Sequence, residues 1–154
     1  ALVRQLQART MGREYDALVC GPVAKAGRGE APIGRHPVER TRMAVVASGK
    51  PAVTEFEPRE HGAEWSWLRC RLQSGRTHQI RVHLASIGHP LIGDPVYLDR
   101  RARARLPQQA QAFPRQALHA ARLTLCHPVS GDNQTWTSEL PADLRMLLDS
   151  LRDA

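Results

Sequence analysis

Aromatic residues and lysine are both scarce in this chain of 154 residues. Aromatic side chains make up 5% of the sequence, so the core that a hydrophobic fraction of 42% permits must be mostly aliphatic. Lys25 and Lys50 are the only lysines, and arginine supplies the rest of the positive charge behind a formal net charge of +7. A guanidinium matches phosphate with paired hydrogen bonds, so an arginine-rich basic chain is compatible with a nucleic-acid partner. Genomic base composition explains the same bias about equally well.

Cysteine is also sparse and forms no pairing motif. Cys20, Cys70 and Cys126 lie far apart in apolar, strand-like runs, and their number is odd. We therefore expect buried thiols in a reducing cytoplasm rather than disulfides or a zinc site. No apolar run is long enough for a membrane-spanning helix and no signal peptide is visible, so we expect a cytoplasmic protein with no membrane partner.

The pattern of apolar residues predicts an α+β domain in which strands dominate. Alternating or short apolar runs suggest strands at 13–21, 42–46, 65–72, 118–126 and 135–140. Gly131 and Asp132 lie at the tip of a predicted turn between the last two of these strands. Because several neighbouring strands are joined by short turns, we expect a mostly antiparallel mixed sheet with flanking helices.

The spacing of apolar residues predicts helices in two further segments, whereas a third segment shows no such spacing. Pro141 opens a predicted final helix whose buried face consists of Leu144, Leu147, Leu148 and Leu151. Residues 1–10 have helical spacing without a start methionine or a cap, so we expect the sequence to begin inside a helix of a longer protein. Residues 98–116 are rich in arginine with little periodicity, and we predict a loop there.

The stretch SGRTHQIRVHLASIGHPLIGDPVY, residues 74–97, mixes basic and apolar side chains more closely than a core or a solvated surface requires. Its spacing predicts a helix that Thr77 caps at the N-terminus. Ile80, Leu84 and Ile87 would then lie on the buried face.

A helix in this position would give the nearby basic residues different surroundings. Arg81 would lie on the flank of the buried face, partly desolvated, and would need a carboxylate or phosphate partner. Arg76 and His78 would lie in the first turn, where helix N-termini attract anions. A partly buried helix with solvated flanks explains the same composition without any ligand.

Other chemistries find less support in this sequence. The spacings among His78, His83 and His89 are five and six residues, unlike the four-residue spacing of a helical zinc pair. No nucleophile elbow and no common phosphate-binding glycine loop is present. We therefore expect neither a metal nor a hydrolase triad.

The stretch 74–97 closely resembles the signature of the RluA-type pseudouridine synthases. The resemblance extends over nearly the whole chain, through REYDALVCG, RHPVERTRMAVVASGKPAVTEFE and QALHAARLTLCHPVSG. It implies isomerisation of uridine to pseudouridine in RNA, with the target base flipped into a pocket and without any metal or organic cofactor. The similarity is to the branch that acts on uridines of a 23S rRNA stem-loop, so RNA is the implied partner.

The resemblance also assigns roles to individual residues. Tyr15 matches the tyrosine that stacks on the base, and Arg81 matches the arginine that pairs with the catalytic aspartate. Ile80 and Val82 match apolar positions that support the pocket. Arg76, Thr77, His78 and His83 lie in the matching motif and are implied to support the pocket or to contact the RNA backbone. Apart from the resemblance, the arginine-rich segment suggests further RNA contacts through the phosphates, at Arg100, Arg101, Arg103 and Arg105. A solvated loop is an equally good explanation for the last four.

The aspartate of the family has no counterpart in this sequence. In the family it lies upstream in an RLD-x-x-TSG motif, which is absent here, whereas Asp94 follows the arginine and is interpreted as a turn or cap beside Pro95. We therefore expect residues 1–154 to be the C-terminal portion of a catalytic domain, without the aspartate motif or any S4-type RNA-binding domain. Such a fragment should be inactive alone and should self-associate through the face left by the missing strands. The alternative is a non-catalytic RNA-binding module or pseudo-enzyme.

Overall fold

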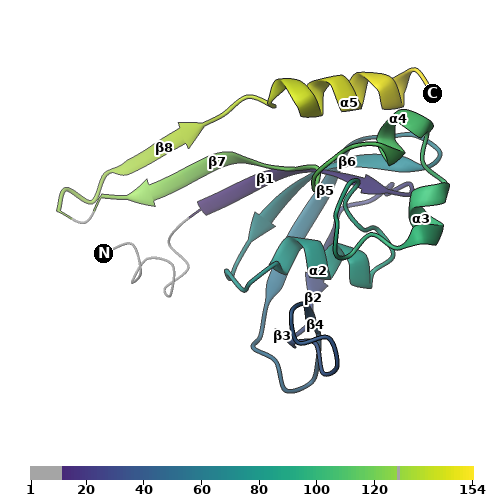
Figure 1. Cartoon of the computed structure of the whole chain (residues 1–154). Coiled ribbons are helices and arrows are strands. Elements are labelled where there is room, and N and C mark those ends of the chain that lie inside the picture. Colours follow the sequence, from purple (N-terminus) through teal and green to yellow (C-terminus); the bar gives the residue numbers. More distant parts are fainter. Residues whose placement is uncertain (1–11, 128) are drawn as a thin grey trace.

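The large sheet of the molecule has six strands. The structure is a computed structural model that describes residues 12–127 and 129–154. In spatial order the strands are β2 (Gly27–Glu30), β5 (Val53–His61), β6 (Trp65–Leu72), β1 (Gly12–Cys20), β7 (Leu118–Cys126) and β8 (Asn133–Thr137). Every pairing between these strands is antiparallel in the described residues (Figure 1). The predicted α+β class with an antiparallel sheet is confirmed.

The remaining elements lie around this sheet. A small second sheet pairs β3 (Ile33–Arg35) with β4 (Met43–Val45). The helices are α2 (Gln79–Ser86), α3 (Arg100–Ala104), α4 (Gln108–Gln111) and α5 (Ala142–Arg152). None of the helices in the described part of the chain is long and apolar enough to cross a membrane.

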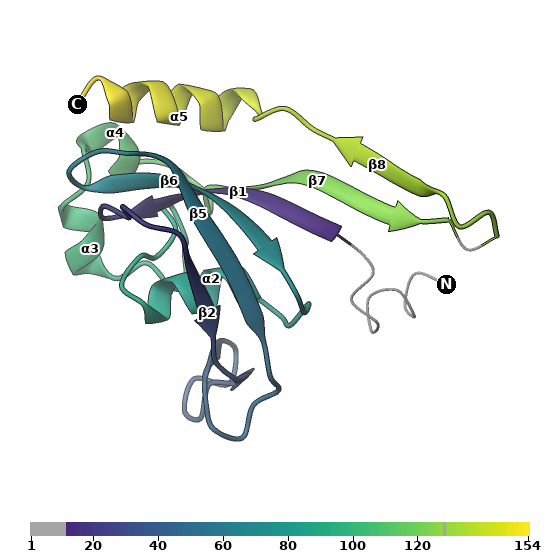
Figure 2. The same cartoon turned by 180° about the vertical axis from the view of Figure 1, so that it is seen from behind.

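Helices α2 and α5 cover opposite faces of the large sheet (Figure 1, Figure 2). On one face, Ala17 and Leu68 pack in a cluster with Ile80 of α2. On the other face, Leu18 and Trp65 pack in a cluster with residues of α4 and α5. Successive residues of a strand point to opposite faces, so β1 contributes alternately to the two layers.

The final helix, α5, has the buried face that the leucine spacing predicts, so this prediction is confirmed. Pro141 is its N-cap, and its buried residues are Leu144, Leu147, Leu148 and Leu151. The hairpin of β7 and β8 is also confirmed, with Gly131 in its turn at φ 77°. A positive φ favours glycine, which has no Cβ to clash.

The prediction of a loop over residues 98–116 is wrong, because this segment contains α3 and α4. Asp99 caps α3 by accepting a hydrogen bond from the backbone N–H of Ala102 at 2.7 Å, and Pro107 precedes α4 as its N-cap. Both helices are too short to show a repeat of apolar residues. The helix predicted for residues 1–10 lies outside the described residues.

Candidate active site

Several of the site residues predicted from the sequence line one cavity. It has a volume of about 250 Å³ and lies between β1, the turn that precedes α2, and the segment that leads into β7. The predicted residues that line it are Tyr15, Arg76, His78, Ile80 and Arg81. They come from parts of the chain more than fifty residues apart, so folding is what brings them together.

Tyr15 reaches the cavity because of its position on β1. It has the same parity as Ala17 and Val19, so its side chain points to the face that α2 covers, where it packs against the cluster that contains Ile80. The described residues offer no hydrogen bond to its hydroxyl. An aromatic ring held on an apolar floor, with its hydroxyl unengaged, is suited to stack on a planar ligand.

The start of α2 differs from the prediction. The N-cap is His78, not Thr77, and His78 has left-handed backbone angles with φ 54° and ψ 26°. It is the one non-glycine residue with positive φ among the described residues. Such a conformation costs about 1–3 kcal/mol and persists where the surroundings impose it.

Gln79 holds the turn in front of α2 in place. Its Oε1 accepts hydrogen bonds from the Ser74 hydroxyl at 2.9 Å and from the Arg76 backbone N–H at 3.0 Å. Its Nε2 donates to the carbonyl of Val53 at 2.8 Å and to the hydroxyl of Thr54 at 3.1 Å. This buried amide therefore ties the cavity wall to β5. Sequence reasoning missed it because two of its four partners, Val53 and Thr54, lie 26 and 25 residues away.

The carboxylate partner that Arg81 was expected to need lies within this chain. Arg81 Nε donates to Asp94 Oδ2 at 2.8 Å and Arg81 Nη2 donates to Asp94 Oδ1 at 2.9 Å. The side chains are 10% and 0% exposed. The hydrogen bond to Asp94 raises the pKa of Arg81, so the guanidinium that lines the cavity stays charged.

Asp94 also has the turn role predicted for it. Its Oδ1 accepts from the backbone N–H groups of Val96 at 2.9 Å and Tyr97 at 3.1 Å. Burial acts to raise the pKa of Asp94, but the hydrogen bonds from Arg81 and from the two backbone N–H groups outweigh it, and the pKa is lowered. Asp94 is thus an ionised carboxylate whose oxygens are both occupied, which makes it a poor nucleophile.

His78 and Tyr97 form a second polar contact at the cavity wall. His78 Nδ1 lies 2.8 Å from the Tyr97 hydroxyl, and the two rings meet edge to face at 79°. Burial, and then the positive charge of Arg81, lower the pKa of His78. Its imidazole is therefore neutral at neutral pH.

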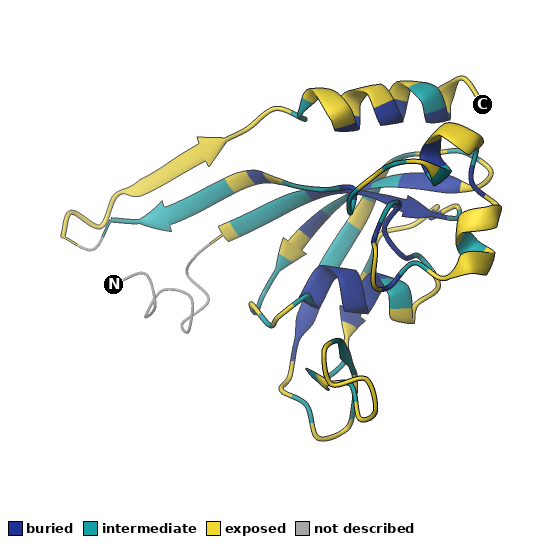
Figure 3. Ribbon diagram, in the orientation of Figure 1, coloured by how far each residue is buried: buried dark blue, intermediate teal, exposed yellow. Residues whose placement is uncertain are grey.

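Two residues of α2 lie outside the lining of the cavity. Val82 packs with Ile33, Ala52 and Tyr97, and its expected role in supporting the pocket stays a prediction. His83 is 1% exposed, and its ring contacts the Thr54 hydroxyl at 2.8 Å and the Ala31 carbonyl at 2.9 Å. The interior position of His83 contradicts a direct contact with RNA, and Figure 3 shows how deeply α2 is buried.

Ile87 also corrects the predicted buried face of this helix. It is 44% exposed, because α2 ends at Ser86 and Ile87 is its C-cap. Ile80 and Leu84, by contrast, are buried as predicted.

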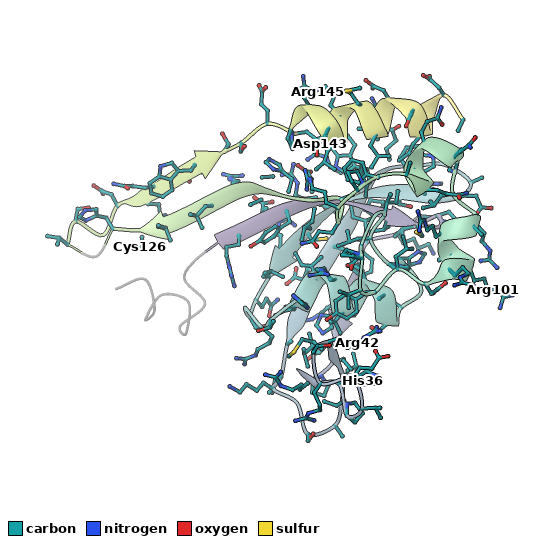
Figure 4. All side chains as sticks on the ribbon, in the orientation of Figure 1. His36, Arg42, Arg101, Cys126, Asp143 and Arg145 are labelled. Atoms are coloured by element: carbon teal, nitrogen blue, oxygen red, sulfur yellow. The ribbon has the colours of Figure 1, made fainter. Side chains whose placement is uncertain are left out.

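The four arginines of the 100–105 segment do not join the cavity. They are exposed on and just after α3, which lies beside α4 at the end of the molecule near the C-terminus (Figure 1). Figure 4 shows Arg101 at this end, far from the tip of the β7–β8 hairpin. Arg103 donates to the Gln111 carbonyl at 2.8 and 3.1 Å, which gives it a structural role in joining α3 to α4. Contact between these arginines and RNA stays a prediction.

A second, more polar groove adjoins the first cavity. It has a volume of about 410 Å³, and Arg76 lines both. Arg35, Lys50 and Thr77 also line it. Arg13 is a further basic residue of the first cavity, which the sequence did not single out; it donates to the Ser74 carbonyl at 3.1 Å. Cationic side chains therefore line both the cavity and the groove that adjoins it.

Comparison with known proteins identifies the class to which this fold and site belong. Residues 1–86, more than half of the chain, match the family described as RNA pseudouridylate synthase. The chain belongs to this family.

Its relatives include enzymes of ribosomal RNA modification. The chain is 53% identical over 152 residues to "Ribosomal large subunit pseudouridine synthase D" of Nitrosomonas europaea, a match that covers 99% of this chain and 44% of that protein. It is 47% identical over 156 residues to the protein of the same name from Pasteurella multocida, covering 98% and 48%. The chain thus spans about half the length of the curated relatives it matches.

A solved structure shares the fold. "Human RNA Pseudouridylate Synthase Domain Containing 1" superimposes with a TM-score of 0.74 at 26% identity, over 99% of this chain and 70% of that chain.

Proposed function

We propose that the protein takes part in the isomerisation of uridine to pseudouridine in 23S ribosomal RNA, and that this chain forms the base-binding part of the active site. The observation that carries the proposal is the shared cavity of Tyr15 and Arg81 in a chain of the RNA pseudouridylate synthase family. The names of its bacterial relatives favour the large ribosomal subunit as the source of the RNA.

The size and lining of the cavity fit a single flipped base. Its volume of about 250 Å³ is slightly below the ~300 Å³ at which pockets for drug-sized ligands begin, and a pyrimidine is smaller than such ligands. An enzyme that acts on a base must remove it from the helical stack and receive it in a pocket. In this proposal Tyr15 stacks on the base while Ile80 forms the apolar floor.

The cationic surroundings of the cavity favour an RNA strand across its opening. Arg13 and Arg76 line the cavity itself, and Arg35 and Lys50 extend the charge into the adjoining groove. Contacts of this kind make binding strongly dependent on salt, because each neutralised phosphate releases counterions. The arginines of α3 would serve only an RNA long enough to reach the far end of the molecule.

The reacting carboxylate is proposed to come from outside this chain. The described residues that line the cavity include no aspartate or glutamate. Asp94 is occupied by four hydrogen bonds. Asp16 points to the opposite face of the sheet, where it accepts from Trp67 Nε1 at 3.0 Å and pairs with Arg69. The chain alone should therefore bind uridine without converting it.

The test is to measure pseudouridine in a 23S rRNA transcript by chromatography of its nucleosides. The chain is combined with the part of the Nitrosomonas europaea relative that it does not match. Besides stacking, the Tyr15 hydroxyl is proposed to help remove the ring proton of the base, and proton transfer by a positioned group contributes about 10²–10⁴-fold. We therefore expect pseudouridine with the wild-type chain and at least a ~100-fold loss of rate with Tyr15→Phe, which keeps the ring and removes the hydroxyl. Binding without conversion in every combination would favour a non-catalytic RNA-binding module instead.

A further inference from the structure

Tyr97 joins three parts of the molecule and contacts two residues, His78 and Arg81, that line the cavity. It is 7% exposed, and its hydroxyl accepts a hydrogen bond from the backbone N–H of Met43 at 2.9 Å. The same hydroxyl contacts His78 Nδ1 at 2.8 Å. The guanidinium of Arg81 lies 5.0 Å from the centre of its ring. This residue therefore contacts the β3–β4 hairpin, the turn before α2 and the principal arginine of the cavity.

The hydrogen bonds of the Tyr97 hydroxyl favour one position for the proton of His78. A phenol has one proton to donate and lone pairs to accept with. The backbone N–H of Met43 can only donate, so the Tyr97 oxygen accepts that bond. His78 Nδ1 is the acceptor within reach of the phenol proton in the described residues. A neutral imidazole that accepts at Nδ1 carries its proton at Nε2.

The backbone of His78 supports a ligand-directed role. Its left-handed conformation, at φ 54°, is uncommon outside glycine, and residues held in such conformations cluster at active sites and ligand-binding sites. The side chain lines the cavity together with Tyr15 and Arg81. With Nδ1 turned to Tyr97, the opposite ring nitrogen is the one left for a ligand.

We propose that His78 donates a hydrogen bond from Nε2–H to the carbonyl oxygen at C4 of uracil, and that Tyr97 is the positioning residue that fixes this tautomer. A donor at this place distinguishes uridine from cytidine, because cytosine carries an amino group at C4 that cannot accept the bond. A neutral imidazole suits a neutral carbonyl, whereas phosphates are better matched by the arginines around the cavity. The inference rests on the proposed function and specifies how the same site selects its base.

The first test measures the tautomer without any RNA. The ¹⁵N chemical shifts of the histidine side chains are recorded at pH 8, above the ordinary histidine pKa of about 6.5. His36 provides an internal reference, because its Nδ1 accepts from the backbone N–H groups of Val38 at 3.1 Å and Glu39 at 2.9 Å. We expect His78 to show the same protonation pattern as His36. In Tyr97→Phe, which keeps the ring and removes the hydroxyl, only the His78 signals should change toward a mixture of tautomers.

The second test measures base selectivity with this chain. Two five-nucleotide RNAs are compared, one with a central uridine among adenosines and one with a central cytidine. Because a single hydrogen bond contributes about 0.5–1.5 kcal/mol, we expect the ratio of the Kd for the cytidine RNA to the Kd for the uridine RNA to fall about three- to tenfold in His78→Asn. In Tyr97→Phe the ratio should fall by a smaller factor, because part of the His78 population still carries its proton at Nε2. Asparagine tolerates the left-handed backbone and is too short to replace the imidazole. His36→Gln is the matched control and should leave the ratio unchanged.

The outcomes separate this inference from the proposed function. A proton on Nδ1 of His78 in the wild-type chain would overturn the inference. So would binding of both RNAs with the same ratio in the wild type and in His78→Asn, while the proposed function would stand. Absence of binding to either RNA by the wild-type chain would overturn both.

Discussion

At the scale of single residues, the ion pair of Arg81 and Asp94 connects the fold to the site. Arg81 lines the cavity, and Asp94 keeps it ionised and fixed in orientation through two hydrogen bonds. A buried charge that loses its partner is strongly destabilising, whereas an exposed pair contributes little. The structure contains a buried ion pair and exposed ion pairs, so the cost of breaking each kind can be compared directly.

Asp94→Asn should lower the free energy of unfolding by about 3 kcal/mol, because it leaves the Arg81 charge without its counterion in a buried position. The matched control is Glu60→Gln, which removes an exposed pair with Arg152 at 2.7 Å and should cost at most about 1 kcal/mol. Urea unfolding of the two variants measures the difference. Equal losses would contradict the structural role assigned to Asp94.

His83 gives the stability of the chain a dependence on pH. Burial lowers the pKa of His83 below its ordinary 6.5, although the Ala31 carbonyl acts in the opposite direction. The unfolded chain therefore takes up a proton at a higher pH than the folded chain does. The contribution of neutral His83 is complete above about pH 6.5 and is lost as the pH falls toward its lower folded-state pKa.

His83→Gln should reduce this pH dependence, because an amide can accept from Thr54 and donate to Ala31 without titrating. The free energy of unfolding, measured at pH 7.5 and at pH 5.5, should fall less between the two values in the variant than in the wild type. An unchanged difference would assign the pH dependence to other groups.

At the scale of elements, the sequence predicted those helices and strands that are long enough to show a regular spacing of apolar residues. Alternation along 65–72 predicted the strand that is β6, and the leucine spacing after Pro141 predicted the buried face of α5. The helices α3 and α4 have five and four residues, so neither could show a repeat. Asp99 caps α3, and Arg103 joins α3 to α4 through the Gln111 carbonyl; no pattern in the sequence indicates either contact.

The site was predictable where a motif marked it and not where tertiary contacts made it. Tyr15 and Arg81 were predicted from sequence motifs, and both line the same cavity. Gln79, Asp94 and Tyr97 acquire their roles from partners 13 to 54 residues away. Sequence spacing cannot show which of several polar side chains will meet at such separations.

Helix α5 offers a test of how far packing on one face stabilises the fold. Leu148→Ala should cost about 2–5 kcal/mol, because Leu148 is 3% exposed in the cluster with Trp65 and Leu106. Met146→Ala is the control in the same helix and should change stability by no more than about 0.5 kcal/mol, since Met146 is 72% exposed. Equal effects, measured by thermal or urea unfolding, would show that α5 does not pack as described.

At the scale of the whole molecule, β7 and β8 form a ribbon that extends away from the two helix-covered faces (Figure 1, Figure 2). All five residues of β8 are exposed, and within the described residues its outer edge pairs with no other strand. Trp136 on this strand is 50% exposed. An exposed edge strand with an aromatic residue is a template for pairing with another chain.

The isolated chain should therefore self-associate through β8. Light scattering should show a mass that rises with concentration, and Trp136→Lys should shift the chain toward monomer, because charged side chains on an edge strand oppose pairing. Val38→Lys is the control, since Val38 is 80% exposed but lies outside the large sheet. A wild-type chain that stays monomeric at all concentrations would contradict this expectation.

We propose that this chain provides the uridine pocket of a pseudouridine synthase while the reacting carboxylate comes from elsewhere. The most direct test is the release of tritium from a 23S rRNA transcript labelled at C5 of uridine, because pseudouridine formation must expel that hydrogen. We expect no release by the chain alone, and release once the unmatched part of the Nitrosomonas europaea relative is added. Release by the chain alone would contradict it, since one of the carboxylates of this chain would then have to perform the reaction.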